Sequence, residues 1–323
     1  MSGKEPGSKV EMYPKTYQTS DDEEVYILDS DSKLLINAGY QKLMSIKIAE
    51  PYTQDYLNED QFRGAEGYTD EEIEDDKKYV KEFEAKFEKG QNQNYKEMKK
   101  KADILEYIIF EQGETGNWFG KLAHTIKTCK SDDIKNGIDL VVETQEYVGE
   151  GLEDSIDDKK LSYLGLAADI TFERMDNALG MGKDIPQKFQ TIINEINQGM
   201  LAEVKYYKSR LSGPKTLINI PRVVLNIDSK MANELIELWV NNKDNELANH
   251  KIHIVIIHQI VAQLAVYEEY AREVKRKKIA EKLKQVYEEL EDVLMQKRKD
   301  FPQHAKFLNI EKMKEAYRAI LKI

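Results

Sequence analysis

Three apolar segments between residues 132 and 207 decide the fold. They read Asn136-Gly-Ile-Asp139-Leu-Val-Val-Glu143, Leu164-Gly-Leu-Ala-Ala-Asp169-Ile-Thr171 and Leu201-Ala-Glu203-Val-Lys205-Tyr-Tyr207. Apolar and β-branched residues fill each one, which predicts β-strands over 138–144, 161–172 and 200–207, with a further strand over 223–227. Residues 185–198 predict a helix between the second and third strands, with Pro186 near its start and Gly199 after its end.

Helical patterns lie on both sides of these strands. Thr69-Asp-Glu-Glu72 is a capping box that opens a charged helix to about residue 89, and a second, mostly apolar helix follows over about 95–112. After the strands, the pattern predicts helices over 230–241, 245–278, 279–299 and 310–323. The chain is therefore predicted to be α+β or α/β. A small mixed β-sheet of about four or five strands, within residues 120–228, is flanked by helices, and a long helical C-terminal region follows.

This pattern divides the chain into four parts. Residues 1–68 are predicted to be a flexible acidic arm with short ordered pieces, and residues 69–112 a helical segment. Residues 113–228 form the α/β core, and residues 229–323 a helical region packed on that core.

Composition excludes several classes of protein. No apolar run approaches the roughly 20 residues that span a bilayer, and the first residues show no apolar signal region, so we expect a cytoplasmic protein. The single cysteine, Cys129, excludes an internal disulfide and a cysteine zinc site. The formal net charge of −11 disfavours a general nucleic-acid binder. It still permits an acidic metallonuclease with a local basic groove.

Charged residues interrupt the apolar sequences of the predicted strands. Asp139 and Glu143 lie in the first strand, Asp169 near the end of the second, and Glu203 with Lys205 in the third. Such charges are expensive to bury unless they bind a metal, pair with each other or take part in chemistry. Several carboxylates and one lysine are what a Mg²⁺-dependent (or Mn²⁺-dependent) phosphodiester hydrolase needs. The Asn136-Gly137 turn would place Asp139 near the mouth of its strand.

Residues 95–230 resemble the PD-(D/E)XK nuclease superfamily. The resemblance rests on the order of a helix with Glu106, strands with Asp139 and Asp169, a helix, and a strand with Glu203-Val-Lys205. It implies a fold of helix, three strands, helix and strand, with an active-site Asp on one strand and (Asp/Glu)-x-Lys on the next. Here the strand after Asp139 reads Asp169-Ile-Thr171, so the lysine would have moved to Lys205. Alternatively, Asp169 is the first Asp and Glu203-Val-Lys205 the full motif. The sequence from Asp132 to Asp139 also resembles sequences in uncharacterised bacterial families, and that resemblance implies no function.

The resemblance assigns a role to each candidate residue. Asp139 and Asp169 would bind the metal, with support from Glu143 or Glu203. Lys205 would orient water or stabilise the phosphate, and Glu106 would be an accessory ligand or base from the helix. Weaker nucleic-acid contacts are predicted at Lys183, Lys188 and Lys208.

Other interpretations stay open. Glu-x-Lys triplets are common in a chain that is 33% charged, and Asp at a strand end is often a turn cap. The alternatives to a nuclease are a non-catalytic scaffold or interaction protein on a nuclease-derived fold, and a metal-dependent enzyme acting on a phosphorylated small molecule. The basic run Lys275–Lys278 is either a solvated helix face or a phosphate contact. The heptad-like apolar stripe over 279–294 packs within the chain or forms a homodimer seam.

Overall fold

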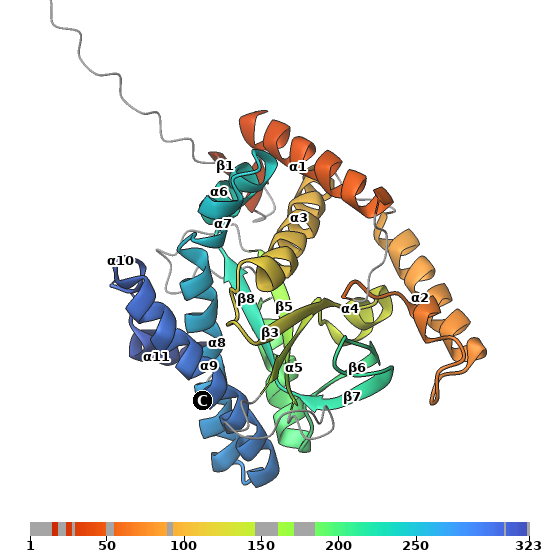
Figure 1. Cartoon of the computed structure of the whole chain (residues 1–323), viewed down its shortest axis with the longest axis vertical. Coiled ribbons are helices and arrows are strands. Elements are labelled where there is room, and N and C mark those ends of the chain that lie inside the picture. The colour runs from red at the N-terminus through yellow and green to blue at the C-terminus, as the bar shows by residue number, and fades with distance from the viewer. Residues whose placement is uncertain are drawn as a thin grey trace, which may run out of the picture.

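A computed structural model of the chain describes residues 15–18, 24–27, 30–49, 55–88, 93–145, 161–170, 185–306 and 308–321. Figure 1 shows helices gathered around a small sheet. Before the sheet come β1 (Lys15–Gln18), β2 (Glu24–Ile27), α1 (Ser30–Ala49), the 3₁₀ helix η1 (Glu59–Phe62), α2 (Asp70–Glu88) and α3 (Gln93–Thr115). After it come α6 (Ser229–Val240), α7 (Asp244–Ala248), α8 (Ile252–Glu273), α9 (Lys277–Asp300), α10 (Pro302–Ala305) and α11 (Ile310–Leu321).

The central sheet has four strands in the order β3-β4-β5-β8. Their bounds are β3 (Ala123–Lys127), β4 (Leu140–Gln145), β5 (Leu161–Ile170) and β8 (Arg222–Ile227). The first three are antiparallel neighbours, whereas β8 pairs in parallel with β5. A parallel pair needs a crossover, and α5 (Ile185–Gln198) lies in that connection with the bounds that its Pro and Gly punctuation predicts. The predicted mixed sheet, flanked by helices and followed by a long helical region, is confirmed.

One predicted strand lies elsewhere. The segment with Glu203 and Lys205 forms β6 (Ala202–Tyr207), which pairs with β7 (Lys215–Ile220) in a separate two-stranded sheet. Its expected place in the central sheet is therefore wrong, because β8 takes the position beside β5. The sequence pattern also missed β7 and the short helix α4 (Lys130–Asn136).

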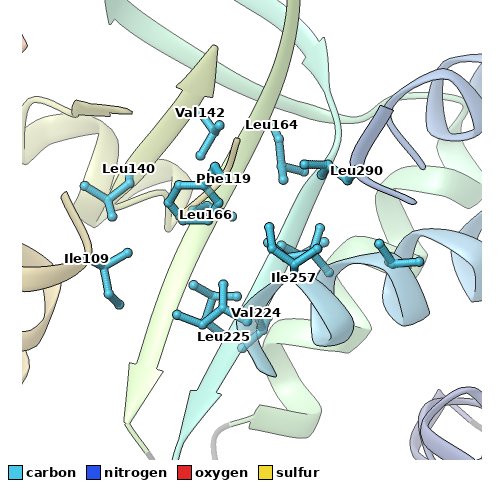
Figure 2. Close-up of a cluster of buried hydrophobic side chains, with 14 of the residues drawn as sticks. Ile109, Phe119, Leu140, Val142, Leu164, Leu166, Val224, Leu225, Ile257 and Leu290 are labelled. Atoms are coloured by element: carbon cyan, nitrogen blue, oxygen red, sulfur yellow. The ribbon is translucent and has the colours of Figure 1, made fainter. Parts of the chain in front are cut away.

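One face of the central sheet packs against helices. Leu140 and Val142 of β4 and Leu164 and Leu166 of β5 are buried together with side chains of α3, α8 and α9. Figure 2 shows this cluster gathered around Phe119. These strand positions alternate along β4 and β5, as expected for one face of a pleated sheet. The hairpin β6–β7 covers the other face, where Val141 packs in a second cluster with Tyr206 and Tyr207.

Two glutamines of α8 pair with the edge strand β8. The side-chain amide of Gln263 accepts from the Val224 N–H at 2.9 Å and donates to the Val224 carbonyl at 2.8 Å. Gln259, one turn earlier, makes the same pair of bonds to Asn226, at 2.9 and 2.7 Å. Both side chains are buried. Buried backbone groups need partners, so these amides replace a fifth strand and explain why polar residues interrupt the apolar text of α8.

The C-terminal helices pack on the core within the chain. The stripe of α9, with Leu283, Val286, Leu290 and Leu294, is buried in the main cluster against α8 and the sheet. Its residues are therefore used in intramolecular packing, the first of the two predicted alternatives. Helix α1 also joins this core through the fully buried Ile36 and Leu43. None of the helices in the described part of the chain is long and apolar enough to cross a membrane.

Candidate functional site

Asp139 lies immediately before β4, after the turn that follows α4. Gly137 caps α4 in the left-handed conformation, with φ of 62°, which glycine adopts without the strain of a Cβ atom. The Asp139 N–H donates to the Leu166 carbonyl of β5 at 3.0 Å, and Thr128 donates its N–H to the Asp139 carbonyl at 3.2 Å. The backbone is therefore fixed from both sides, at the place that the Asn136-Gly137 signal predicts.

Charged side chains from three elements gather around Asp139. We call Glu106, Lys127, Lys130, Asp133 and Asp139 the carboxyl–lysine cluster. Glu106 comes from α3, and its Oε2 lies 2.7 Å from Nζ of Lys127 on β3. Lys130 pairs with Asp133 on α4, and the Asp133 and Asp139 carboxyls share a hydrogen bond. Asp139 is only 7% exposed.

The cluster is charge-balanced when Asp139 keeps its proton. Burial, Glu106 and Asp133 raise the Asp139 pKa well above its ordinary value. Burial opposes ionisation of Asp133 too, but Lys130 and Lys127 outweigh it and lower the Asp133 pKa. Burial by itself would lower the pKa of Lys127 and of Lys130, because it disfavours their charged forms. Even so, Glu106 and the aspartates raise the Lys127 pKa, and Asp133 raises that of Lys130 to about 12. Two carboxylates then face two ammonium groups, and the protonated Asp139 carboxyl donates a hydrogen bond to Asp133.

The donor chemistry of this cluster fits Mg²⁺ or Mn²⁺. Mg²⁺ takes oxygen ligands, and proteins usually hold it through one or two carboxylates, with water and substrate phosphate in the remaining positions. Asp139 and Glu106 supply such oxygens, and a divalent cation would relieve the crowding of negative charge that raises the Asp139 pKa. Within the described ranges, however, no three Asp, Glu, His or Cys side chains form a group that could hold a metal ion by themselves.

Lys205 and Glu203 are not brought into this cluster. The Lys205 amine lies 2.9 Å from Asp76 Oδ2 on α2, where the Tyr206 hydroxyl also donates, at 2.7 Å. Glu203 is exposed. Asp132 fixes this arrangement, because its carboxylate accepts the backbone N–H groups of Lys205 and Tyr206 at 2.8 and 2.9 Å. The lysine beside Asp139 is therefore Lys127 of β3.

Glu143 lies apart from Asp139. It is fully buried opposite Tyr163 of β5, and its carboxylate interacts with the hydroxyls of Tyr163 and Tyr207. Burial and the Glu143 charge raise the Tyr163 pKa to about 12. Nearby, Lys215 of β7 donates to the Tyr163 hydroxyl at 2.8 Å. Glu143 therefore belongs to the interface between the sheet and the hairpin β6–β7.

The remaining predicted residues are only partly described. The backbone of Asp169 pairs with Asn226 in β5 and β8, but its side chain lies outside the described residues, as does all of Lys183. Lys208 is half-buried just after β6. Lys188 of α5 lines a groove of about 290 Å³ together with Lys135, the Asn136-Gly137 turn, Glu195 and Arg222.

Sequence reasoning missed Lys127, Lys130 and Asp133. One signal was present, since Lys127 ends the run Ala123-His-Thr-Ile-Lys127, where an inward lysine needs a buried partner. That partner is Glu106 on α3, the helix that packs against β3. Comparison of the chain with protein-family models, with curated proteins and with solved structures gives no match.

Proposed function

We propose that this protein is a nuclease-like hydrolase that cleaves phosphodiester bonds of DNA or RNA with the help of Mg²⁺ or Mn²⁺. The observation that carries the proposal is the crowding of Asp139 by Glu106 and Asp133 at the mouth of β4, which raises the Asp139 pKa. Buried carboxyl groups with strongly shifted pKa values are enriched at functional sites. Apart from α4 and the inserted hairpin β6–β7, the chain runs through helix α3, strands β3, β4 and β5, helix α5 and the parallel strand β8. This order supports the resemblance to the PD-(D/E)XK superfamily. A cytoplasmic location goes with this substrate and is part of the proposal.

The side chains of the cluster would divide the work. Asp139 and Glu106 would hold the metal ion, which when bound supplies charge stabilisation and an acidified water. Asp133 accepts the hydrogen bond of the Asp139 carboxyl and so positions that group. Lys127 keeps its positive charge at neutral pH, which suits it to stabilise charge developing on a phosphate. In this arrangement Lys127 takes the role that the sequence assigns to Lys205.

The test is cleavage of labelled single- and double-stranded DNA and RNA, with Mg²⁺ or Mn²⁺, by the wild type and three variants. Asp139→Asn can still donate a hydrogen bond to Asp133. It should remain folded but lose activity by roughly 100-fold or more, the scale of losing one stabilising group at an active site. Lys127→Ala should lose activity as well, whereas Lys205→Ala should retain most of it. Full activity in Asp139→Asn would refute the proposed site, and loss only in Lys205→Ala would return the catalytic lysine to Lys205.

One observation favours a second candidate, a non-catalytic scaffold on a nuclease-derived fold. Two lysines neutralise the carboxylates of the cluster, and no three-ligand metal group is found in the described ranges. A scaffold should show no cleavage in any metal and no Mg²⁺ or Mn²⁺ binding by calorimetry. Metal-dependent cleavage that Asp139→Asn abolishes would exclude this candidate.

A further inference from the structure

The turn between α8 and α9 carries a concentration of positive charge in an acidic chain. Lys275, Arg276, Lys277 and Lys278 are all exposed, and we call them the basic turn. Residues 272–282 hold six cations and two carboxylates, a net charge of +4 in a chain whose net charge is −11. Among the hydrogen bonds and ion pairs of the described residues, none uses the ammonium groups of Lys275, Lys277 and Lys278. These three cations are therefore free to meet an external anion.

The local structure does not need these charges. Lys277 and Lys278 lie in the first turn of α9, which has no acidic residue there and no side-chain cap. Cations at a helix N-terminus oppose the helix dipole, which favours anions at that end. Lys275 also adopts a left-handed backbone, with φ of 62°, where glycine or asparagine would be easier to accommodate. The C-terminus of α8 can account for Lys275 and Arg276, but it does not account for Lys277 and Lys278.

A continuous set of contacts joins the basic turn to the groove that the Asn136-Gly137 turn lines. The Arg276 guanidinium donates to the Asn197 carbonyl at the end of α5. Two residues earlier on α5, Glu195 lies 2.9 Å from Arg222. Arg222 in turn donates to the Asn136 carbonyl, in the turn that delivers Asp139. Glu195 and Arg222 both line the groove. The last turn of α5 thus lies between the groove and the basic turn.

From this layout we infer that the basic turn binds the phosphate backbone of a nucleic-acid polymer that continues from this groove, which is lined by the Asn136-Gly137 turn two residues before Asp139. This inference rests on the proposed function and names its substrate class. A mononucleotide or phosphorylated metabolite would fill the groove without reaching Lys277 and Lys278, whereas a longer strand would cross both. Phosphate contacts of this kind supply affinity without reading sequence.

The experiment measures binding separately from cleavage. Fluorescence anisotropy of labelled mononucleotide and of single- and double-stranded 20-mers, in EDTA, is recorded from 50 to 300 mM NaCl for the wild type and two triple variants. Lys275→Gln with Lys277→Gln and Lys278→Gln removes the free cations of the basic turn. Lys299→Gln with Lys306→Gln and Lys312→Gln removes three exposed lysines from the last turn of α9 and from the segments that follow it. Lys299 lies about 33 Å along α9 from Lys277, at 1.5 Å per helical residue. Circular dichroism and thermal unfolding check that both variants are folded.

For three lost phosphate contacts on a duplex, the slope of log affinity against log salt should become shallower by about 2.7, since each contact contributes about 0.9. The control variant should keep the wild-type slope, and mononucleotide binding should be equal in all three proteins. Equal 20-mer binding by the basic-turn variant and the wild type would overturn the inference, as would equal losses in both variants. So would a wild type that binds no polymer.

The two proposals can fail separately. A wild type that binds 20-mers through the basic turn, but never cleaves them in Mg²⁺ or Mn²⁺, would refute hydrolysis and support the inference. A wild type whose metal-dependent cleavage and 20-mer binding both survive loss of the basic turn would support hydrolysis and overturn the inference.

Discussion

Replacing Gln263 by methionine tests whether the α8 amides hold the edge of the sheet. Met has nearly the same length and volume as Gln but can neither donate to the Val224 carbonyl nor accept from the Val224 N–H. Val224 is 2% exposed and Gln263 is fully buried, so water cannot replace the lost partners. The substitution therefore leaves one donor and one acceptor of the backbone unpaired in the core, and it also removes Gln263 as the partner of the Tyr267 and Tyr317 hydroxyls.

The main part of the expected cost comes from the two backbone groups of Val224. Each buried backbone group without a partner costs about 1–3 kcal/mol, so the pair costs about 2–6 kcal/mol. Burying the more apolar methionine side chain returns about 1–2 kcal/mol. We expect a net loss of about 3 kcal/mol in the free energy of unfolding.

The assay is urea unfolding, followed by circular dichroism and tryptophan fluorescence to test for a two-state transition. The matched control is Gln296→Met on α9, because Gln296 is exposed and its side chain donates to Asp300 on the same helix, at 2.9 Å. Its change should stay within about 0.5 kcal/mol. A loss below about 0.5 kcal/mol in Gln263→Met would refute the edge-pairing argument.

Gln263→Glu adds a pH test of the same contacts. A carboxylate can accept from the Val224 N–H but faces the Val224 carbonyl with a second acceptor, and its charge is buried. The variant should therefore be less stable than Gln263→Met at pH 7. It should recover part of the loss near pH 4, where the protonated acid can donate to the carbonyl. A loss independent of pH would contradict this account.

Two further predictions concern the stability of the cluster and of α8. Lys127→Met should cost about 3 kcal/mol, because it leaves the half-buried Glu106 carboxylate without its lysine partner. Adding Glu106→Gln should recover much of that loss in a double-mutant cycle by urea unfolding, and simple additivity would show that the pair is not coupled. His258 is fully buried, and burial lowers its pKa to about 4. Its stability contribution is therefore present above pH 6.5 and is lost as pH falls towards 4. The wild type should lose about 3 kcal/mol of unfolding free energy over this range, and His258→Leu should not show this loss. Parallel stability–pH curves for wild type and variant would refute this.

Local signals in the sequence correctly located many elements. Pro186 and Gly199 punctuate α5, whose bounds match the prediction, because these two residues act on the backbone next to them. The Asn136-Gly137 signal likewise located the turn before Asp139, where Gly137 takes a positive φ. In the structure Leu140, Val142, Leu164 and Leu166 share one buried face, which follows from the side-chain period of two in a strand.

The candidate site was predicted only in part. Glu106 and Asp139 do come together with a lysine, but the pattern could not show that Lys127 would supply the amine. Lys205 has the expected spacing to Glu203, yet its strand pairs with β7, and its amine is held by Asp76. Glu143 lies in the same strand as Asp139 but contacts a different set of residues. Strand spacing fixes the face on which a residue lies, not which distant residues meet it there.

The sequence by itself determined the local features of this protein: the helices, most of the strands, the turn at Gly137 and the acidic residues that interrupt apolar text. Each depends on backbone preferences and side-chain periodicity within a few residues. Only the tertiary structure decided that β8 would lie beside β5, that Gln259 and Gln263 would complete the sheet edge, and that Lys127 would face Glu106. Those choices depend on burying apolar faces and satisfying polar groups between segments far apart in the chain, and no local pattern encodes them.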